Sequence, residues 1–143
     1  MKNLYQNSHY LDNGFLIEGN EENKVERLLD LCLPAFDQTQ SIVVLHCITG
    51  LHALLVLKDY FKDFSKSLDI YTTAVITHLL ALGDIPFSES GSKPISHSWP
   101  KLIALGSDSK PVHTIKFTYT CHELYGLTQR EGLKITLLHQ IKK

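Results

Sequence analysis

The sequence predicts an all-α fold, a compact antiparallel bundle of five or six helices. Apolar residues recur at helical spacing in successive segments, and glycine, proline and capping residues separate these segments. No segment alternates convincingly between apolar and polar residues as a half-buried strand does. The 143 residues therefore fit a single helical domain, 1–143.

The first helix is expected over 21–33, after an irregular N-terminal segment, 1–20, that contains the turn signals "LDNG" and "EGN". Asn20 is suited to cap this helix, and Pro34 is expected to end it. One apolar face follows the spacing i, i+3, i+4, i+7 and consists of Val25, Leu28, Leu29 and Cys32.

The second helix is expected over 39–61 and is apolar on nearly all sides, which is typical of a central helix. The run "SIVVLHCI" taken alone is also compatible with a strand. The length of the whole pattern and its continuation in "HALLVLKDYF" favour a helix. The third helix is expected over 68–82, with Gly83 as its left-handed terminator.

A long loop, 84–98, contains prolines, a glycine and several serines. A short helix over 99–105 is expected to stop at Gly106, and the next helix runs to Tyr125 and ends at Gly126. Its predicted start has Ser107 or Asp108 as the cap and Pro111 in the first turn. The last helix ends near Ile141 and is expected to begin with a capping box formed by Thr128 and Glu131.

The composition excludes several classes of protein. Hydrophobic residues make up 43% and charged residues 20%, as in a globular domain rather than a disordered chain. The net charge of −1 and the lack of long charge runs indicate no nucleic-acid partner. Apolar runs are too short for a membrane span, and the polar N-terminus lacks a signal core, so we expect a cytoplasmic protein. Cys32, Cys47 and Cys121 lie in apolar patterns without CxxC spacing and are expected to be reduced and buried.

Eight histidines make up an unusual share of the chain, and two of them lie in the most apolar helix. His46 and His52 are about 120° apart on the helical wheel, with Thr49 between them. Gly50, on the side of His46, allows another group to approach the backbone closely. Two interpretations stay open: core histidines bonded to carbonyls or hydroxyls, or metal ligands or catalytic groups.

His113 and Lys116 form a second pair in "PVHTIKF", where i, i+3 spacing places them on one helical face. A desolvated lysine beside a cation can act as a base or nucleophile, or be carboxylated into a metal ligand. The alternative is an ordinary pair at the solvent-facing start of a helix. His122 and His139 are expected at the surface, and His78 in the core or at its boundary. No zinc-protease, P-loop, dinucleotide-binding or G-x-S-x-G motif is present.

Three blocks in order, "VLHCITGLHALLVL", "YTTAVITHLLALG" and "SDSKPVHTIKFTYTCHELYGLT", resemble the C-terminal half of the questin oxidase-like proteins. The similarity spans about 40–135 and follows a "H-x-x-T-x-x-H-A-L" helix, an apolar helix and a "D-x-H-x-x-K" helix. Members of that family are much longer, with further histidines in their N-terminal halves. Leu55 also replaces an arginine that often follows the "HAL" motif.

The resemblance implies an all-helical fold and an oxygenase of the Baeyer–Villiger kind, acting on anthraquinone-type polyketides. It further implies non-haem iron held by histidines and a carboxylated lysine, with NADPH as a possible cosubstrate. The corresponding positions in this chain are His46, His52, His113 and Lys116.

Two functions remain open from the sequence. The first is an oxidoreductase that acts on an aromatic or polyketide-like substrate, with only part of the metal site in this chain. The second is a non-catalytic helical module that binds a small aromatic or apolar ligand or a partner. In both cases we expect a homodimer, because the helix over 39–61 has more apolar surface than a small bundle covers.

Overall fold

The computed structural model describes residues 18–83 and 96–142, and these ranges contain six α-helices, one 3₁₀ helix and no strand. The all-α prediction is therefore confirmed. Most of the irregular N-terminal segment and of the predicted loop over 84–98 lies outside the described residues. The helices are α3 (Glu21–Thr39), α4 (Ile42–Val56), η1 (Lys58–Tyr60), α5 (Phe64–Ala81), α6 (Trp99–Ser107), α7 (Val112–Thr128) and α8 (Glu131–Ile141).

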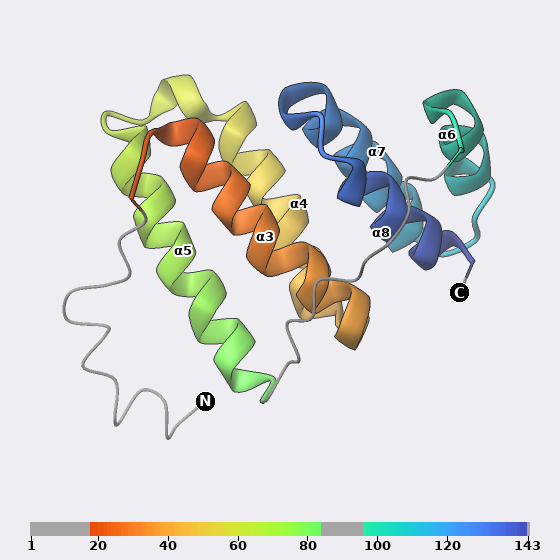
Figure 1. Ribbon diagram of the computed structural model, residues 1–143, viewed down its shortest axis with the longest axis horizontal. Coiled ribbons are helices and arrows are strands. Elements are labelled where there is room, and N and C mark those ends of the chain that lie inside the picture. Colours follow the sequence, from red (N-terminus) through yellow and green to blue (C-terminus); the bar gives the residue numbers. More distant parts are fainter. Residues whose placement is uncertain (1–17, 84–95, 143) are drawn as a thin grey trace.

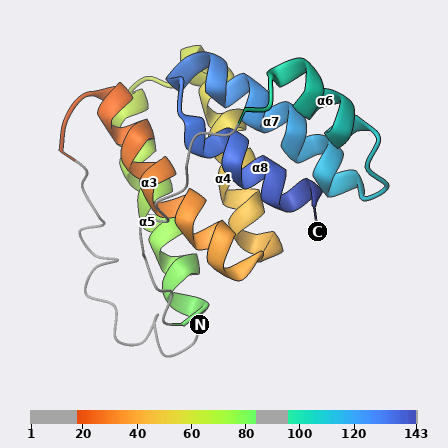
Figure 2. The same ribbon diagram turned by 45° about the vertical axis from the view of Figure 1, so that its right-hand side comes forward.

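The helices form two groups of three that pack against each other (Figure 1). The first group contains α3, α4 and α5, and the second contains α6, α7 and α8. Consecutive helices within each group run in roughly opposite directions, as Figure 2 also shows. The groups meet where α4 contacts α7 and α3 contacts α8. Each of these pairs joins two helices that are distant in sequence.

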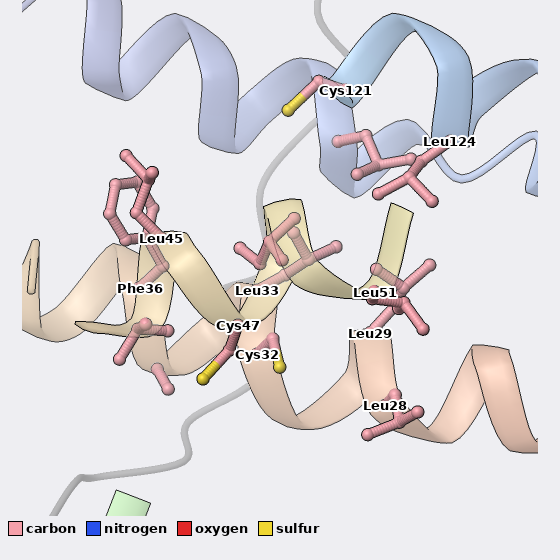
Figure 3. Packing of buried hydrophobic residues seen from close by; sticks show 14 of the residues in the cluster. Leu28, Leu29, Cys32, Leu33, Phe36, Leu45, Cys47, Leu51, Cys121 and Leu124 are labelled. Carbon is pink, nitrogen blue, oxygen red and sulfur yellow. The ribbon is translucent and has the colours of Figure 1, made fainter. Parts of the chain in front are cut away.

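The core draws most heavily on α3 and α4, with further buried residues from α5, α7 and α8, and Figure 3 shows part of it between the two groups. The predicted apolar face of the first helix is confirmed, because all four of its residues are buried. Phe36 of α3 meets Phe117 of α7 with ring centres 5.2 Å apart, which joins the groups directly. Burial of each large apolar side chain contributes about 1.5–3 kcal/mol, so this core holds α4 and α7 in a fixed relation.

The first helix does not end at Pro34, as the sequence predicted, but continues to Thr39. Ala35 and Phe36 beyond the proline are both buried. A proline inside a helix costs about 3 kcal/mol, and the burial of this last turn offsets that cost. The helix ends instead at Gln40, whose left-handed backbone has φ 52° and whose N–H donates to the Phe36 carbonyl.

The second and third helices differ from their predicted bounds because side-chain caps fix their starts. Ser41 accepts a hydrogen bond from the Val43 N–H, so α4 begins at Ile42 rather than near Thr39. Asp63 accepts one from the Lys66 N–H, so α5 begins earlier than predicted. Between them the chain turns through η1, and α4 is correspondingly shorter than the predicted helix.

Two predicted glycine stops are wrong. Gly106 lies inside α6 and is buried, and a Cβ at this position would approach the Thr118 Cβ of α7 within 2.8 Å. Gly106 therefore permits close packing of two helices rather than ending one. Gly126 lies inside α7, which continues to Thr128. Gly83, by contrast, has φ 96° just beyond Leu82, the C-cap of α5, as predicted.

The predicted start of α7 and the capping box of α8 are also wrong. Pro111 is the N-cap of α7 and not part of its first turn. Thr128 belongs to the last turn of α7, and its hydroxyl donates to the Leu124 carbonyl instead of capping α8. Gln129 adopts a left-handed conformation with φ 57°, so the chain reverses within two residues and Arg130 becomes the N-cap of α8.

The three cysteines are free and buried, as the sequence predicted. Burial raises the pKa of the Cys32 thiol, with a further contribution from Cys47, and burial also raises the pKa of Cys47 and Cys121. These thiols therefore belong to the core as neutral groups. Among the described residues, no helix combines the length and apolar character that crossing a membrane requires.

Candidate functional site

Helix α4 is buried on one side only, which differs from the central position that the sequence predicted. Val44, Cys47 and Ile48 are buried, whereas Ile42 and Val56 are 47% and 66% exposed. His46 is exposed and His52 is half-buried. The two histidines thus lie on the open side of α4 and need no buried hydrogen-bond partner for each ring nitrogen.

The close approach predicted at Gly50 is made by Tyr71 of α5. The Tyr71 hydroxyl donates to the Cys47 carbonyl, and a Cβ on Gly50 would lie 2.6 Å from that hydroxyl oxygen. Burial raises the pKa of Tyr71, with smaller contributions from Cys47 and Cys32, so its hydroxyl stays a proton donor. This contact fixes α4 against α5 at Cys47 and Gly50.

A groove between α4 and α7 brings together most of the candidate site residues. Its volume is about 520 Å³, within the range of roughly 300–1,000 Å³ that is common for small-molecule sites. Its apolar lining exceeds its polar lining. The lining residues are Leu45, His46, Thr49, His113, Ile115, Lys116, Tyr119 and Thr120.

The histidine rings of the groove come from different helices. His46 of α4 and His113 of α7 meet edge to face, with ring centres 5.6 Å apart and planes at 85°. His52 does not line the groove but packs edge to face against Tyr119, with ring centres 5.7 Å apart. The structure therefore pairs His46 with His113. His52 of α4 contacts α7 separately, through Tyr119.

Lys116 lines the same groove from α7 and is exposed. Within the described ranges it forms no ion pair, whereas Lys24 pairs with Asp69 at 3.0 Å and Lys58 with Glu21 at 2.7 Å. Of the two interpretations of the pair, the exposed position of Lys116 agrees with a solvent-facing pair and not with a desolvated lysine. Its ammonium is available to a ligand in the groove.

The ring spacing of the imidazole pair is compatible with two ligands of one transition-metal ion. Imidazoles that bind one ion through nitrogens at about 2.1 Å have ring centres roughly 5 Å apart. The 5.6 Å separation of His46 and His113 is close to that value, and both side chains reach solvent. In the part of the chain that the structure describes, no group of three histidine, cysteine or carboxylate side chains could hold a metal ion. A metal ion held by this pair would need further ligands, for which Lys116, water, substrate or another chain are candidates.

The other described histidines lie outside the groove. His122 packs against Trp99 with ring centres 5.1 Å apart, and His139 is exposed, with Nδ1 3.3 Å from Asp37 Oδ1. Burial raises the pKa of Asp37, while hydrogen bonds from His139 and Thr136 oppose this rise. His78 lies at the core boundary, as predicted, and His9 falls outside the described residues.

Tyr119, Thr120 and Ile115 were not recognised as groove residues from the sequence. The spacing from His113 through Lys116 to Thr120 is i, i+3, i+7, which is the signal that could have extended the predicted pair along α7. Tyr119 borders this stripe and is 61% exposed, which is unusual for a large aromatic ring.

Comparison of the chain with protein-family models, with curated proteins and with solved structures found no match. The similarity to questin oxidase-like proteins therefore depends on the three sequence blocks described above.

Proposed function

We propose that this chain carries part of the active site of a questin oxidase-like oxidoreductase, an oxygenase that acts on an aromatic or polyketide-like substrate. One observation supports this proposal most strongly. Three of the four positions that correspond to the family's ligands, His46, His113 and Lys116, line one groove although they come from two helices distant in sequence.

His46 and His113 are the two groups proposed to hold the metal, each through one ring nitrogen. Imidazole donors suit iron, copper or zinc better than magnesium or calcium. The chemistry that bound non-haem iron supplies is activation of dioxygen. Thr49 donates its hydroxyl to the His46 backbone carbonyl, which stiffens the turn of α4 that carries the ring. Lys116 supplies either a third ligand in carboxylated form or a positive charge beside the substrate.

The apolar lining of the groove is proposed to bind the substrate. Leu45 and Ile115 offer aliphatic contacts, and the Tyr119 ring offers a flat surface on which an aromatic ring can stack. NADPH, which the resemblance implies as a cosubstrate, has no glycine-rich nucleotide motif in this sequence to receive it.

A homodimer is proposed to complete the metal site. Two imidazoles leave a first-row metal ion with open positions, and a two-fold axis at the groove would bring four imidazoles together. Ile42, Val112 and Ile115 on α4 and α7 are each at least 40% exposed and would lose water contact in such an interface.

Metal content measured by mass spectrometry on tag-free protein tests this function. We expect close to one iron for each pair of chains, and its loss in His46→Ala and in His113→Ala. His139→Ala is the matched control, because His139 is also exposed but contacts Asp37 outside the groove. Metal retained in both groove variants, or a monomer by light scattering, would contradict the proposal.

The second candidate is a non-catalytic module that uses the groove to bind a small aromatic or apolar ligand. It is favoured by the open position of His46, His113 and Lys116, since catalytic groups commonly lie in sites that exclude water. Oxygen uptake with a hydroxylated anthraquinone separates the two candidates. Substrate-dependent uptake by iron-loaded protein supports the oxygenase, and ligand binding without uptake supports the module.

A further inference from the structure

The polar groups of the groove between α4 and α7 are all neutral or cationic. Its titratable residues are His46, His113, Lys116 and Tyr119, and among the described residues no aspartate or glutamate contributes to the lining. The chain as a whole carries 15 acidic and 14 basic residues, so this absence is local. Within the described ranges, the Lys116 ammonium is thus a charge in the groove that no lining carboxylate balances.

A second cleft shows how different the groove is. It lies where the start of α3, η1 and the end of α7 meet, with a volume of about 870 Å³. There Lys58 is matched by Glu21 at 2.7 Å, and Glu22 and Glu26 also line the cleft. The cation of that cleft is already neutralised by the protein, whereas Lys116 has no carboxylate partner within the described ranges.

The apolar side chains of the groove indicate which kind of ligand body it could bind. Leu45 and Ile115 present aliphatic surface, and Tyr119 presents a ring that is 61% exposed. His52 packs on Tyr119 at 5.7 Å and limits the orientations of that ring. A flat apolar body of a few fused rings fits a volume of about 520 Å³.

We infer that this groove selects a planar aromatic ligand that carries a carboxylate, with the carboxylate beside Lys116 and the His46–His113 pair and the rings on Tyr119. A carboxylate accepts charge-assisted hydrogen bonds from ammonium and imidazole N–H groups, which are stronger than those made by a neutral amide. This inference rests on the proposed use of the groove as a small-molecule site, but it requires no metal.

Calorimetric titration of the metal-free full chain tests the charge preference. The probes are 2-naphthoate and 2-naphthamide, which share one ring system and differ in charge. We expect naphthoate to bind about three- to ten-fold more tightly than naphthamide at low salt, and this ratio to fall at high salt. Equal affinities, tighter binding of the amide, or no heat from either probe at about 1 mM would each overturn the inference.

Lys116→Met locates the preference, because it removes the charge and keeps the apolar stem. The naphthoate advantage should fall by at least about half in this variant, with a smaller change in naphthamide binding. Lys101→Met is the control, since Lys101 is exposed on α6 and does not line the groove. A preference that survives Lys116→Met, or is lost in Lys101→Met, contradicts the assignment. Naphthoate selectivity without iron binding would sink the oxygenase alone, and iron binding without selectivity would sink this inference alone.

Discussion

The two sides of α4 have opposite characters although they belong to one helix of 15 residues. One side carries Cys47, Ile48 and Leu51, which are buried against the core. The other carries His46 and Thr49, which line the groove toward α7. The side that packs contains the apolar and thiol groups, and the side that faces solvent contains the groups that can bind a ligand.

Residues that stabilise the fold and residues proposed to bind a ligand are therefore separate residues of the same helix. The buried side fixes where α4 lies, through Leu51 in the core and the Tyr71 contact at Cys47. The open side can then vary in chemistry at little cost to folding. The two sides should therefore respond differently to reagents and to substitution.

The largest contrast is expected in chemical reactivity. Burial raises the pKa of all three thiols, so both access and thiolate content are low in the native state. We expect their reaction with a disulfide reagent in native protein to be slower than in urea on the order of 10³-fold. Diethyl pyrocarbonate should modify His46 and His113 readily without unfolding. Rapid native reaction at Cys47 would show that the buried side of α4 is open.

The next effect is the loss of a buried side chain. Leu51→Ala removes a fully buried group, and we expect it to lower the free energy of unfolding by about 2–5 kcal/mol. Val56→Ala is the matched control on the same helix, because Val56 is 66% exposed. Apart from the difference in helix propensity between valine and alanine, this substitution should lower the free energy of unfolding by under about 0.5 kcal/mol. Urea unfolding measures both. Similar losses for the two variants would abolish the distinction between the sides.

A smaller effect is expected at Gly50. In Gly50→Ala the new Cβ meets the Tyr71 hydroxyl at 2.6 Å, so we expect a loss of about 1–3 kcal/mol from strain. Tyr71→Phe removes the oxygen that causes the collision. The loss should shrink or reverse in the double variant, because alanine favours a helix over glycine by about 1 kcal/mol. Additive losses would exclude the Tyr71 contact as the reason for glycine here.

The smallest effect on stability is expected for the groove histidines. His46→Ala and His113→Ala remove exposed rings that contact each other edge to face, so each should change the free energy of unfolding by under about 0.5 kcal/mol in metal-free protein. Thermal unfolding with and without added iron measures this. A loss of more than about 2 kcal/mol without metal would make these residues structural.

The helical fold was predictable because the periodic apolar face of α3 and the caps at Asn20 and Gly83 act locally. The wrong boundaries arose where distant contacts decide. Pro34 is kept inside a helix by burial of Phe36, and Gly106 serves contact with Thr118, which lies in another helix. A local sequence pattern carries no information about the partner helix. It therefore cannot show whether a proline or glycine ends a helix or packs inside one.

The sequence named three residues that line the groove, but it also named His52, which does not, and it misjudged their surroundings. The spacing of His113 and Lys116 correctly placed them on one face of α7, and the structure brings His46 to them. Burial was misjudged because the apolar residues around His46 suggest a helix covered on all sides. Ile42 and Val56 are exposed instead, since α3, α5 and α7 cover only part of α4.

The most direct test of the groove as a metal site is a titration with cobalt(II) followed by nitrogen-15 NMR. Paramagnetic broadening locates the ion without reference to activity. We expect the strongest broadening at backbone amides near His46 on α4 and His113 on α7, with loss of this pattern in His113→Ala. Strongest broadening near His122 or His139, or none in the groove at one ion per chain, would contradict metal binding by the His46–His113 pair.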